Sequence, residues 1–401
     1  MFRHLIVGLL MASAACSSWA DTPPTRVLRV ALYPFVPDKP GLFAQVKSAF
    51  ELKHPDIILT IVDLSANYYD ESSPNALTNT DADIWEADSV FLDDLVASGR
   101  IQALPPKAVS GGAAFLPVAR GAMASGGKTY SVPHWVCTNY LFMLRRDDLS
   151  KADSIDKLAM AIPPSHAADH GLLIDLKGRS TLGELYLDAL LDRDKTIEKA
   201  SAHLTLDTFD SSIGAVLGNV RSMCDKGYCR DGQLHLDEGS YPRLFAHNHG
   251  RALVGYSERL YYIQEENQTV CKSGECVPPD VLTSIPPPLS QNGVQPFAWV
   301  DGFTVATSCK GQCLEDAAQF IAEMSSVSSV LSTLLPSGGH APRYLLPAIA
   351  SLYSDPSLLR AAPLYKDLYP AVQNAIPVRG AHLNSNLRDI GKKLDKEILP
   401  D

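Results

Sequence analysis

Short apolar segments that alternate with segments of helical spacing constrain the fold of this chain more than any other feature. Strand-like alternation occurs in 27–33, 56–62, 83–85, 130–143, 251–256 and 299–307, and helical spacing in 41–52, 89–98, 185–191, 213–223 and 316–325. Strands that alternate with helices at this spacing predict an α/β fold with a parallel sheet.

The chain is also expected to leave one lobe, build a second and return. Residues 271–295 are rich in Pro, Gly and Ser and resemble a loop that leads back to the first lobe. We therefore predict a discontinuous first lobe (21–136 and 296–345), a second lobe (137–295) and a C-terminal helical segment (346–401) packed on both. In such a two-lobed binding fold the ligand lies in the cleft between the lobes.

The N-terminus has the features of an export signal. Arg3 precedes an apolar run over 5–15, and a small-x-small motif at 18–20 predicts cleavage before Asp21, so that 1–20 form a signal peptide. The mature chain is expected to be periplasmic or secreted. Lipid anchoring at Cys16 is less favoured, because Ser13 stands where a lipobox normally has an apolar residue. No later run of 18 apolar residues predicts membrane insertion.

The charge balance narrows the range of partners. The chain has 35 Lys and Arg against 45 Asp and Glu, a net charge of −10, with an ordinary globular share of 46% hydrophobic residues. An acidic chain argues against nucleic acid as a partner and suits a cationic or neutral ligand.

Six of the eight cysteines stand in close pairs, which in an exported chain predict local disulfides. The pairs are Cys224/Cys229, Cys271/Cys276 and Cys309/Cys313. Their spacings match no usual zinc finger, and no metal is expected. Cys137 is left unpaired, and on the residues alone it is either buried and inert or kept reactive.

Several predicted strand ends carry an aromatic residue near a carboxylate. These pairs are Tyr33 with Asp38, Trp85 with Asp88, Tyr256 with Glu258, and Trp299 with Asp301. Gathered at one cleft, they would hold a flat cationic ring by stacking, cation–π contact and hydrogen bonding. Taken singly, each pair is better explained as a core aromatic beside a solvated acid, and only the repetition of the pattern at strand ends favours a ligand cleft. His134, three residues before Cys137, is expected to face the opposite side of the strand and to be structural.

Five segments together resemble the thiaminase I (thiamine pyridinylase) family, in order along almost the whole mature chain. They are 32–37 (LYPFVP), 87–92 (ADSVFL), 132–139 (VPHWVCTN), 250–258 (GRALVGYSE) and 344–347 (YLLP). The resemblance implies a type II periplasmic-binding-protein fold and a secreted enzyme that needs no cofactor. In that family a cysteine attacks the pyrimidine of thiamin and expels the thiazole, and an amine, pyridine or thiol then takes the pyrimidine.

The resemblance also implies roles for individual residues. The nucleophile falls on Cys137 and the base that deprotonates it on Glu258. Contacts to thiamin fall on Tyr33, Asp88, Tyr256 and Asp301, and across a gap on Tyr241. The partners implied are thiamin and a small nucleophile, and a monomer is expected. The three cysteine pairs depart from the family core and predict additions to the second lobe and the cleft rim.

Two other functions remain open at this point. A non-catalytic solute-binding protein for thiamin or a polyamine would have the same fold and cleft. A relative that has lost activity could serve as a lectin-like or adhesive protein. Cys137 together with Glu258 favours the enzyme, since a binding protein needs neither a thiol nor a base in its cleft.

Overall fold

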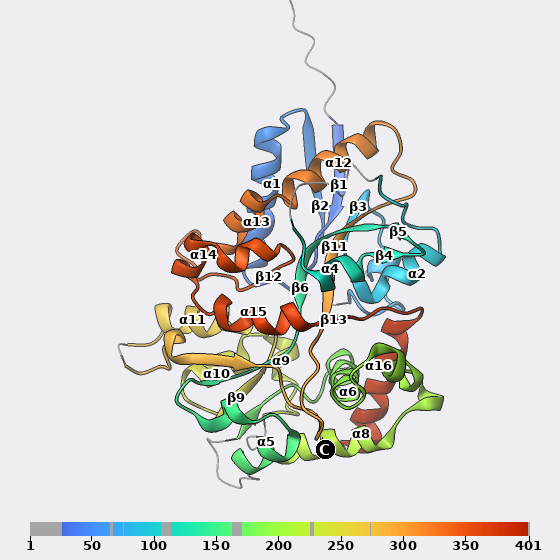
Figure 1. Cartoon of the computed structure of the whole chain (residues 1–401). Coiled ribbons are helices and arrows are strands. Elements are labelled where there is room, and N and C mark those ends of the chain that lie inside the picture. The colour runs from blue at the N-terminus through green and yellow to red at the C-terminus, as the bar shows by residue number, and fades with distance from the viewer. Residues whose placement is uncertain are drawn as a thin grey trace, which may run out of the picture.

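A computed structural model describes residues 26–64, 67–74, 76–105, 114–162, 171–224, 228–272 and 274–399. The predicted signal peptide and Cys16 lie outside the described residues. Two sheets organise the rest of the chain, and Figure 1 shows the larger one in the upper half of the molecule and the smaller one in the lower half. We call the elements around the larger sheet the first lobe and those around the smaller sheet the second lobe.

The larger sheet has the order β12-β6-β11-β3-β1-β2, and β13 pairs with β11. Its strands are β1 (Arg26–Ala31), β2 (Ile57–Val62), β3 (Ile84–Asp88), β6 (Ser131–Cys137), β11 (Phe297–Val305), β12 (Leu346–Pro347) and β13 (Ile376–Pro377). β1 runs parallel to β2 and β3, but β11 runs antiparallel to both β3 and β6. The expectation of a purely parallel sheet is therefore wrong, because β11 enters this sheet as the chain returns from the other lobe.

The smaller sheet has the order β10-β7-β9-β8. Its strands are β7 (Tyr140–Leu144), β8 (Leu172–Leu173), β9 (Ala252–Gly255) and β10 (Leu282–Ile285). The single strand predicted over 130–143 is two strands in different sheets, and the chain crosses between the lobes at Thr138 and Asn139. The predicted loop 271–295 likewise contains β10, which pairs with β7. A short hairpin of β4 (Ala124–Ser125) and β5 (Lys128–Thr129) forms a third sheet.

Helices cover both sheets. They are α1 (Lys39–Lys53), α2 (Leu92–Ala97), α4 (Pro117–Ala122), α5 (Ile155–Ala161), α6 (Arg179–Asp194), α7 (Ile197–Ala200), α8 (Ser211–Ser222), α9 (Gln233–Leu236), α10 (Ser240–Ala246), α11 (Arg259–Thr269), α12 (Gln312–Met324), α13 (Val327–Leu334), α14 (Pro356–Ala361), α15 (Tyr365–Asn374) and α16 (Leu383–Lys393). α1 and α12 pack on the larger sheet, and α6 packs against α7 and α8 in the second lobe.

The C-terminal segment joins both lobes. β12 and β13 extend the larger sheet, so the segment is not only helical, and α16 lies along α6 of the second lobe. This contact is close enough to require glycine. A Cβ on Gly183 of α6 would collide with the carbonyl oxygen of Leu387, and one on Gly391 of α16 with that of Arg179. The tight packing places the side of α16 that carries Arg388 next to the start of α6.

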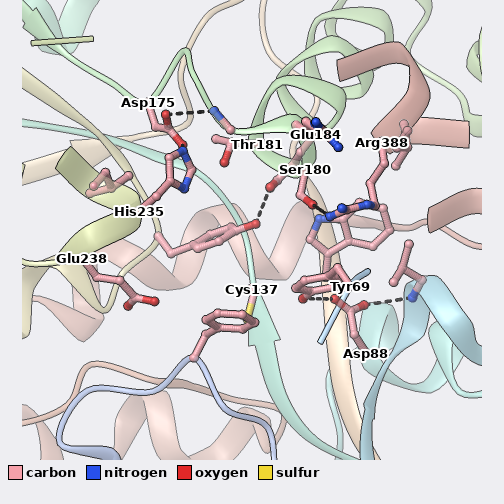
Figure 2. Close-up of a pocket in the computed structure, with 18 of the residues that line it drawn as sticks. Tyr69, Asp88, Cys137, Asp175, Ser180, Thr181, Glu184, His235, Glu238 and Arg388 are labelled. Carbon is pink, nitrogen blue, oxygen red and sulfur yellow. Dashed lines mark hydrogen bonds and ion pairs between the residues drawn. The ribbon is translucent and has the colours of Figure 1, made fainter. Parts of the chain in front are cut away.

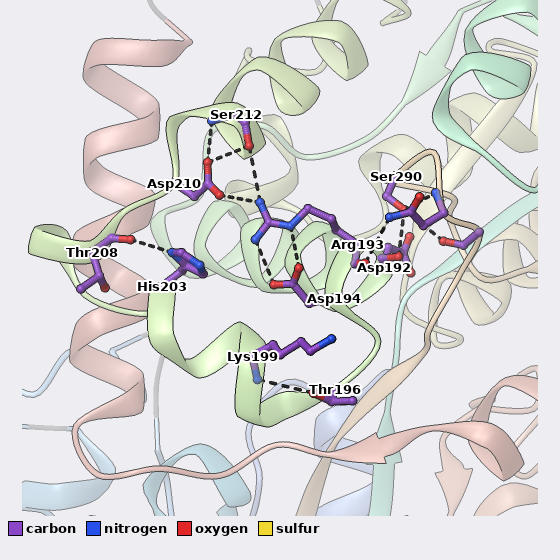
Figure 3. Close-up of polar contacts among 12 residues, drawn as sticks. Asp192, Arg193, Asp194, Thr196, Lys199, His203, Thr208, Asp210, Ser212 and Ser290 are labelled. Atoms are coloured by element: carbon purple, nitrogen blue, oxygen red, sulfur yellow. Dashed lines mark hydrogen bonds and ion pairs between the residues drawn. The ribbon is translucent and has the colours of Figure 1, made fainter.

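The far end of α6 holds the chain that returns to the first lobe. Asp192 accepts hydrogen bonds from the amides of Leu289 (2.8 Å) and Gln295 (2.6 Å) (Figure 3). Next to it, Arg193 forms ion pairs with Asp194 at 2.7 Å and with Asp210 at 2.5 Å. α6 is thus fixed at its far end, while its first turn faces the space between the lobes.

The cysteines pair as their spacing predicts. Disulfides join Cys224 to Cys229, Cys271 to Cys276 and Cys309 to Cys313, and Cys137 is the free, buried cysteine of the described chain. Among the described residues, no helix is both long and apolar enough to cross a bilayer.

Candidate active site

A cavity of about 530 Å³ is lined by residues of both lobes. We call its buried and half-buried part the floor: Tyr33, Tyr69, Asp88, Cys137, Glu184, Tyr256, Glu258 and Trp299. We call a more polar part on the second-lobe side the rim: Asp175, Lys177, Arg179, Ser180, Thr181, His235, Glu238, Arg259 and Arg388. Figure 2 shows Cys137 below and His235, Thr181 and Arg388 above it.

The register of β11 brings Cys137 and two carboxylates together. Trp299 lies opposite Cys137 of β6, and Asp301 lies opposite Asp88 of β3. Residues 299 and 301 point to the same face because side chains alternate along a strand. The Cys137 Sγ therefore lies 3.5 Å from Asp301 Oδ2, to which it donates a hydrogen bond.

A chain of hydroxyl groups ends on Asp88. The Tyr69 hydroxyl donates to Asp88 Oδ2 at 2.8 Å, and the Tyr33 hydroxyl lies 3.0 Å from that of Tyr69. The Val90 amide donates to Asp88 Oδ1 at 2.9 Å. Burial raises the pKa of Asp88 to about 6, although these hydrogen bonds oppose the shift. Near neutral pH this carboxyl group is therefore available in both its ionised and its protonated form.

Glu258 lies in the floor immediately before α11. Burial raises the pKa of its carboxyl group to about 7. The neighbouring Ser257 hydroxyl donates to the carbonyl of Tyr344 at 2.6 Å, which ties this strand end to the segment before β12. A carboxylate with a pKa near 7 can accept a proton at neutral pH and give it back.

Glu184 is a third acid of the floor, and the sequence reasoning missed it. It accepts hydrogen bonds from the Tyr256 hydroxyl and from Asn139 Nδ2 (3.1 Å), and burial raises its pKa to about 7. One signal could have revealed it: Glu184, Asp188 and Asp192 recur every four residues, and the other residues of 182–191 are apolar or aromatic. Such spacing places carboxylates on one helix face, here a buried one.

Cys137 is held as a thiol in the free protein. Burial raises its pKa well above the ordinary value, and the negative charges of Asp301, Glu258 and Asp88 raise it further. Burial and the charge of Asp88 also raise the pKa of Asp301 well above its usual range. The floor thus collects acidic groups without a cation among them, and a cationic ligand would favour ionisation of all of them.

Most of the predicted site residues reach the cavity. Tyr33, Asp88, Cys137, Tyr256 and Glu258 line it, and Asp301 lies against Cys137.

Two members of the aromatic–carboxylate pairs do not reach it. Asp38 pairs with Arg343 at 2.7 Å, and Trp85 stacks with Arg100.

Tyr241 is not brought to the cavity. It lies on α10 inside the second lobe, where its hydroxyl donates to Asp231 Oδ1 at 2.7 Å and also contacts the carbonyl of Tyr228. Tyr241 therefore packs within the second lobe and does not line this cavity, and its contact with the ligand stays a prediction.

His134 does not line the cavity, but it contacts Glu86, which holds the backbone of Tyr33 in the floor. Its Nδ1 lies 2.6 Å from Glu86 Oε1, and Glu86 Oε2 accepts a hydrogen bond from the Tyr33 amide at 2.9 Å. Glu86 was not singled out in the sequence, where it reads as one more residue of a short strand. Because it holds the backbone at Tyr33, it fixes one wall of the cavity.

The raised pKa values predict that stability falls as the pH rises. A carboxyl group whose pKa is near 7 in the folded protein and about 4.5 in the unfolded chain stabilises the fold below pH 4.5 and loses this effect as the pH rises to 7. We expect the unfolding free energy of the ligand-free protein to be lower at pH 8 than at pH 5 by about 2 kcal/mol or more. Urea unfolding at the two pH values measures this. Glu184→Gln should reduce the difference, and an equal difference in that variant would contradict the assignment.

Comparisons with known sequences find similarity to thiaminase-1. The Thiaminase-1 domain model matches residues 147–272. The thiaminase-1 of Paenibacillus thiaminolyticus is 26% identical over 99% of this chain and 93% of its own length.

Solved structures establish the fold. Clostridium botulinum thiaminase I in complex with thiamin superposes with a TM-score of 0.80 at 24% identity, over 93% of this chain and all of that one. Thiaminase I from Bacillus thiaminolyticus gives 0.77 at 24% identity over the same shares. Maltose-bound T. maritima MalE3 gives 0.67 at 16% identity, over 92% of this chain and 93% of that one. The chain therefore has the predicted two-lobed, type II periplasmic-binding-protein-like fold, and its full-length similarity and domain match confirm the resemblance to the thiaminase I family.

Proposed function

We propose that this protein is a thiaminase I-type transferase that cleaves thiamin by covalent base exchange. The observation that carries the proposal is a free cysteine, Cys137, in the same buried cavity as Glu258, whose pKa of about 7 suits a general base. The full-length similarity to thiaminase-1 supports the same activity.

The floor suits the substrate. Thiamin is a cation with two aromatic rings, and Tyr33 and Tyr256 offer faces for stacking and cation–π contact. Asp88 and Asp301 lie on the same side as Cys137 and can hydrogen-bond to the pyrimidine. In its protonated form either group donates to a ring nitrogen, which stabilises the negative charge that the ring gains during attack.

The reaction then runs in two displacements. Glu258 accepts the thiol proton, the Cys137 sulfur forms a bond to the pyrimidine, and the thiazolium leaves with the electron pair of the broken C–N bond as neutral thiazole. In the second step an amine, pyridine or thiol bonds to the pyrimidine unit and the sulfur departs with its electron pair. Glu258 returns its proton to the sulfur and takes one from a protic nucleophile. Two easier steps replace one difficult step.

The substrate itself takes part in activating the thiol. In the free protein the pKa of Cys137 is raised by burial and by three acidic neighbours, so the thiolate is scarce. The positive charge of bound thiamin offsets those negative charges and lowers the cost of forming the thiolate. This arrangement protects the cysteine from oxidation and alkylation until thiamin arrives.

A non-catalytic solute-binding protein is the less favoured function. The shared fold with MalE3 would suit it, but binding alone has no use for Cys137 beside Glu258. We further propose that the chain is exported and acts as a monomer, with thiamin and a small nucleophile as its partners and no cofactor. The three disulfides suit an oxidising compartment.

An intact-mass measurement tests the proposal directly. The mature protein is mixed with excess thiamin, with and without aniline, and free thiazole is followed in parallel. We expect thiazole release and a pyrimidine adduct on Cys137 that aniline removes. Tight thiamin binding without thiazole or adduct would instead make the protein a solute-binding protein.

A further inference from the structure

The rim of the cavity is basic, in contrast to the floor. Lys177 lies just before α6 and Arg179 is its first residue. Arg388 reaches in from α16 (Figure 2). These two segments are far apart in the sequence and are brought together by the close packing of α6 on α16. The chain as a whole has a net charge of −10, so this cluster of positive side chains is opposite in sign to the net charge of the protein.

The acidic groups of the rim are already paired. Asp175 lies 3.1 Å from His235 Nε2, and Glu238 lies 3.5 Å from Arg259. The hydrogen bond to Asp175 raises the pKa of His235, as expected for this pairing.

Arg179 and Arg388 are the positive charges of the rim that form no ion pair with the described residues. Arg388 donates to the Ser180 hydroxyl at 3.0 Å, and within the described part of the chain neither arginine has a carboxylate within 4 Å. Asp70 is a carboxylate near both arginines: their charges contribute to its lowered pKa, after its hydrogen bonds from Ser72, but among the described residues it forms an ion pair with neither. Lys177 is less available, because it lies 3.5 Å from Asp395.

This charge pattern does not suit thiamin alone. The acidic floor fits a cation, whereas a second positive group at the rim would be repelled by Arg179 and Arg388. Arginine is the side chain best suited to bind a planar or tetrahedral anion through two hydrogen bonds. The group that occupies the rim should therefore be negative.

We propose that Arg179 and Arg388 form an anion subsite that binds a carboxylate, sulfonate or phosphoryl group of a reactant whose other end reaches the floor. The subsite deepens the proposed function, on which it rests. The anion has two possible sources: an acidic nucleophile that takes the pyrimidine, or a phosphate ester of thiamin. In either case the subsite selects charged reactants over neutral ones of the same reactivity.

A matched pair of thiols tests the first source. 2-Mercaptoethanol and 2-mercaptoethanesulfonate present the same reactive group with and without an anion, and thiazole release with each gives two KM values. We expect the ratio of the KM for 2-mercaptoethanol to the KM for 2-mercaptoethanesulfonate to fall about tenfold in Arg179→Gln/Arg388→Gln, because this variant loses a partly exposed, charge-assisted contact. Arg388→Lys should keep most of the preference. Arg146→Gln removes the same charge from an exposed position outside the cavity and should leave the ratio unchanged.

Thiamin monophosphate tests the second source without turnover. Cys137→Ser is titrated by calorimetry with thiamin and with thiamin monophosphate, in the presence and absence of the two arginine substitutions. A loss of about tenfold for the phosphate ester alone would identify the ester as the occupant. Unchanged thiol ratios and unchanged ester affinity would overturn the subsite. Absence of thiazole release in the wild type would overturn the proposed function, while the titration would still decide the subsite.

Discussion

Replacing Cys137 by serine is expected to abolish turnover while thiamin still binds. A serine hydroxyl is far harder to ionise than a thiol, and it would stand in a cavity where burial and three carboxyl groups already oppose ionisation of the sulfur. We expect thiazole release to fall about 10⁴-fold or more. Thiamin affinity, measured by calorimetry, should stay within about threefold, since one sulfur contact is a small part of the binding surface.

A matched control separates this effect from a general loss of cysteine. Cys309→Ser/Cys313→Ser also replaces sulfur by oxygen, but at a disulfide that does not line the cavity. That variant should keep its turnover at a temperature well below its melting point. Full activity in Cys137→Ser would remove covalent catalysis by this residue.

Replacing Glu258 by glutamine is expected to give the second largest effect. Glutamine has nearly the same shape but cannot accept the proton of Cys137, and loss of a general base costs about 10²- to 10⁴-fold. In the wild type, activity should rise with pH through about 7, because the raised pKa of Glu258 keeps the base protonated below that value. This rise should vanish in the variant.

Alkylation of Cys137 by iodoacetamide reports on the same group without turnover. Its rate should increase with pH in the wild type, and the profile should change in Glu258→Gln. Glu265→Gln, on the helix α11 that follows Glu258 but outside the cavity, is the control. Identical alkylation profiles in the wild type and Glu258→Gln would show that another group takes the proton.

Several of the residues foreseen from the sequence stand at the ends of strands, although Asp301 lies within β11. The carboxyl ends of strands gather at one edge of a sheet, so an aromatic residue next to an acid at such positions points to a cleft. Asp88, Tyr256 and Glu258 follow this pattern. Trp85 does not, because it lies within β3 and not at its end.

The features of the site that the sequence did not predict depend on strand register and on the packing of distant segments. Asp301 was predicted as a contact to the ligand, but its hydrogen bond with Cys137 was not. That bond arises because β11 runs antiparallel between β3 and β6, a pairing that the sequence does not reveal. Glu184 was not foreseen, because its burial depends on contacts with Asn139 and Tyr256, which are distant from it in the sequence. Tyr241 was assigned through a gap in the resemblance, and a shift of a few residues on a helix is enough to turn a side chain into the core.

The crossing of the chain at Thr138 and Asn139 has a consequence for the order of events. Cys137 is the last residue before this crossing, whereas Glu184, Tyr256 and Glu258 belong to the other lobe. We expect any opening of the cleft to turn about the crossings, so that the sulfur moves least and the wall carrying the base moves most. Trapping the adduct and measuring its access to thiols of increasing size would test this. The pyrimidine could then stay bonded to Cys137, close to the axis of the opening motion, while the thiazole leaves and the second nucleophile enters.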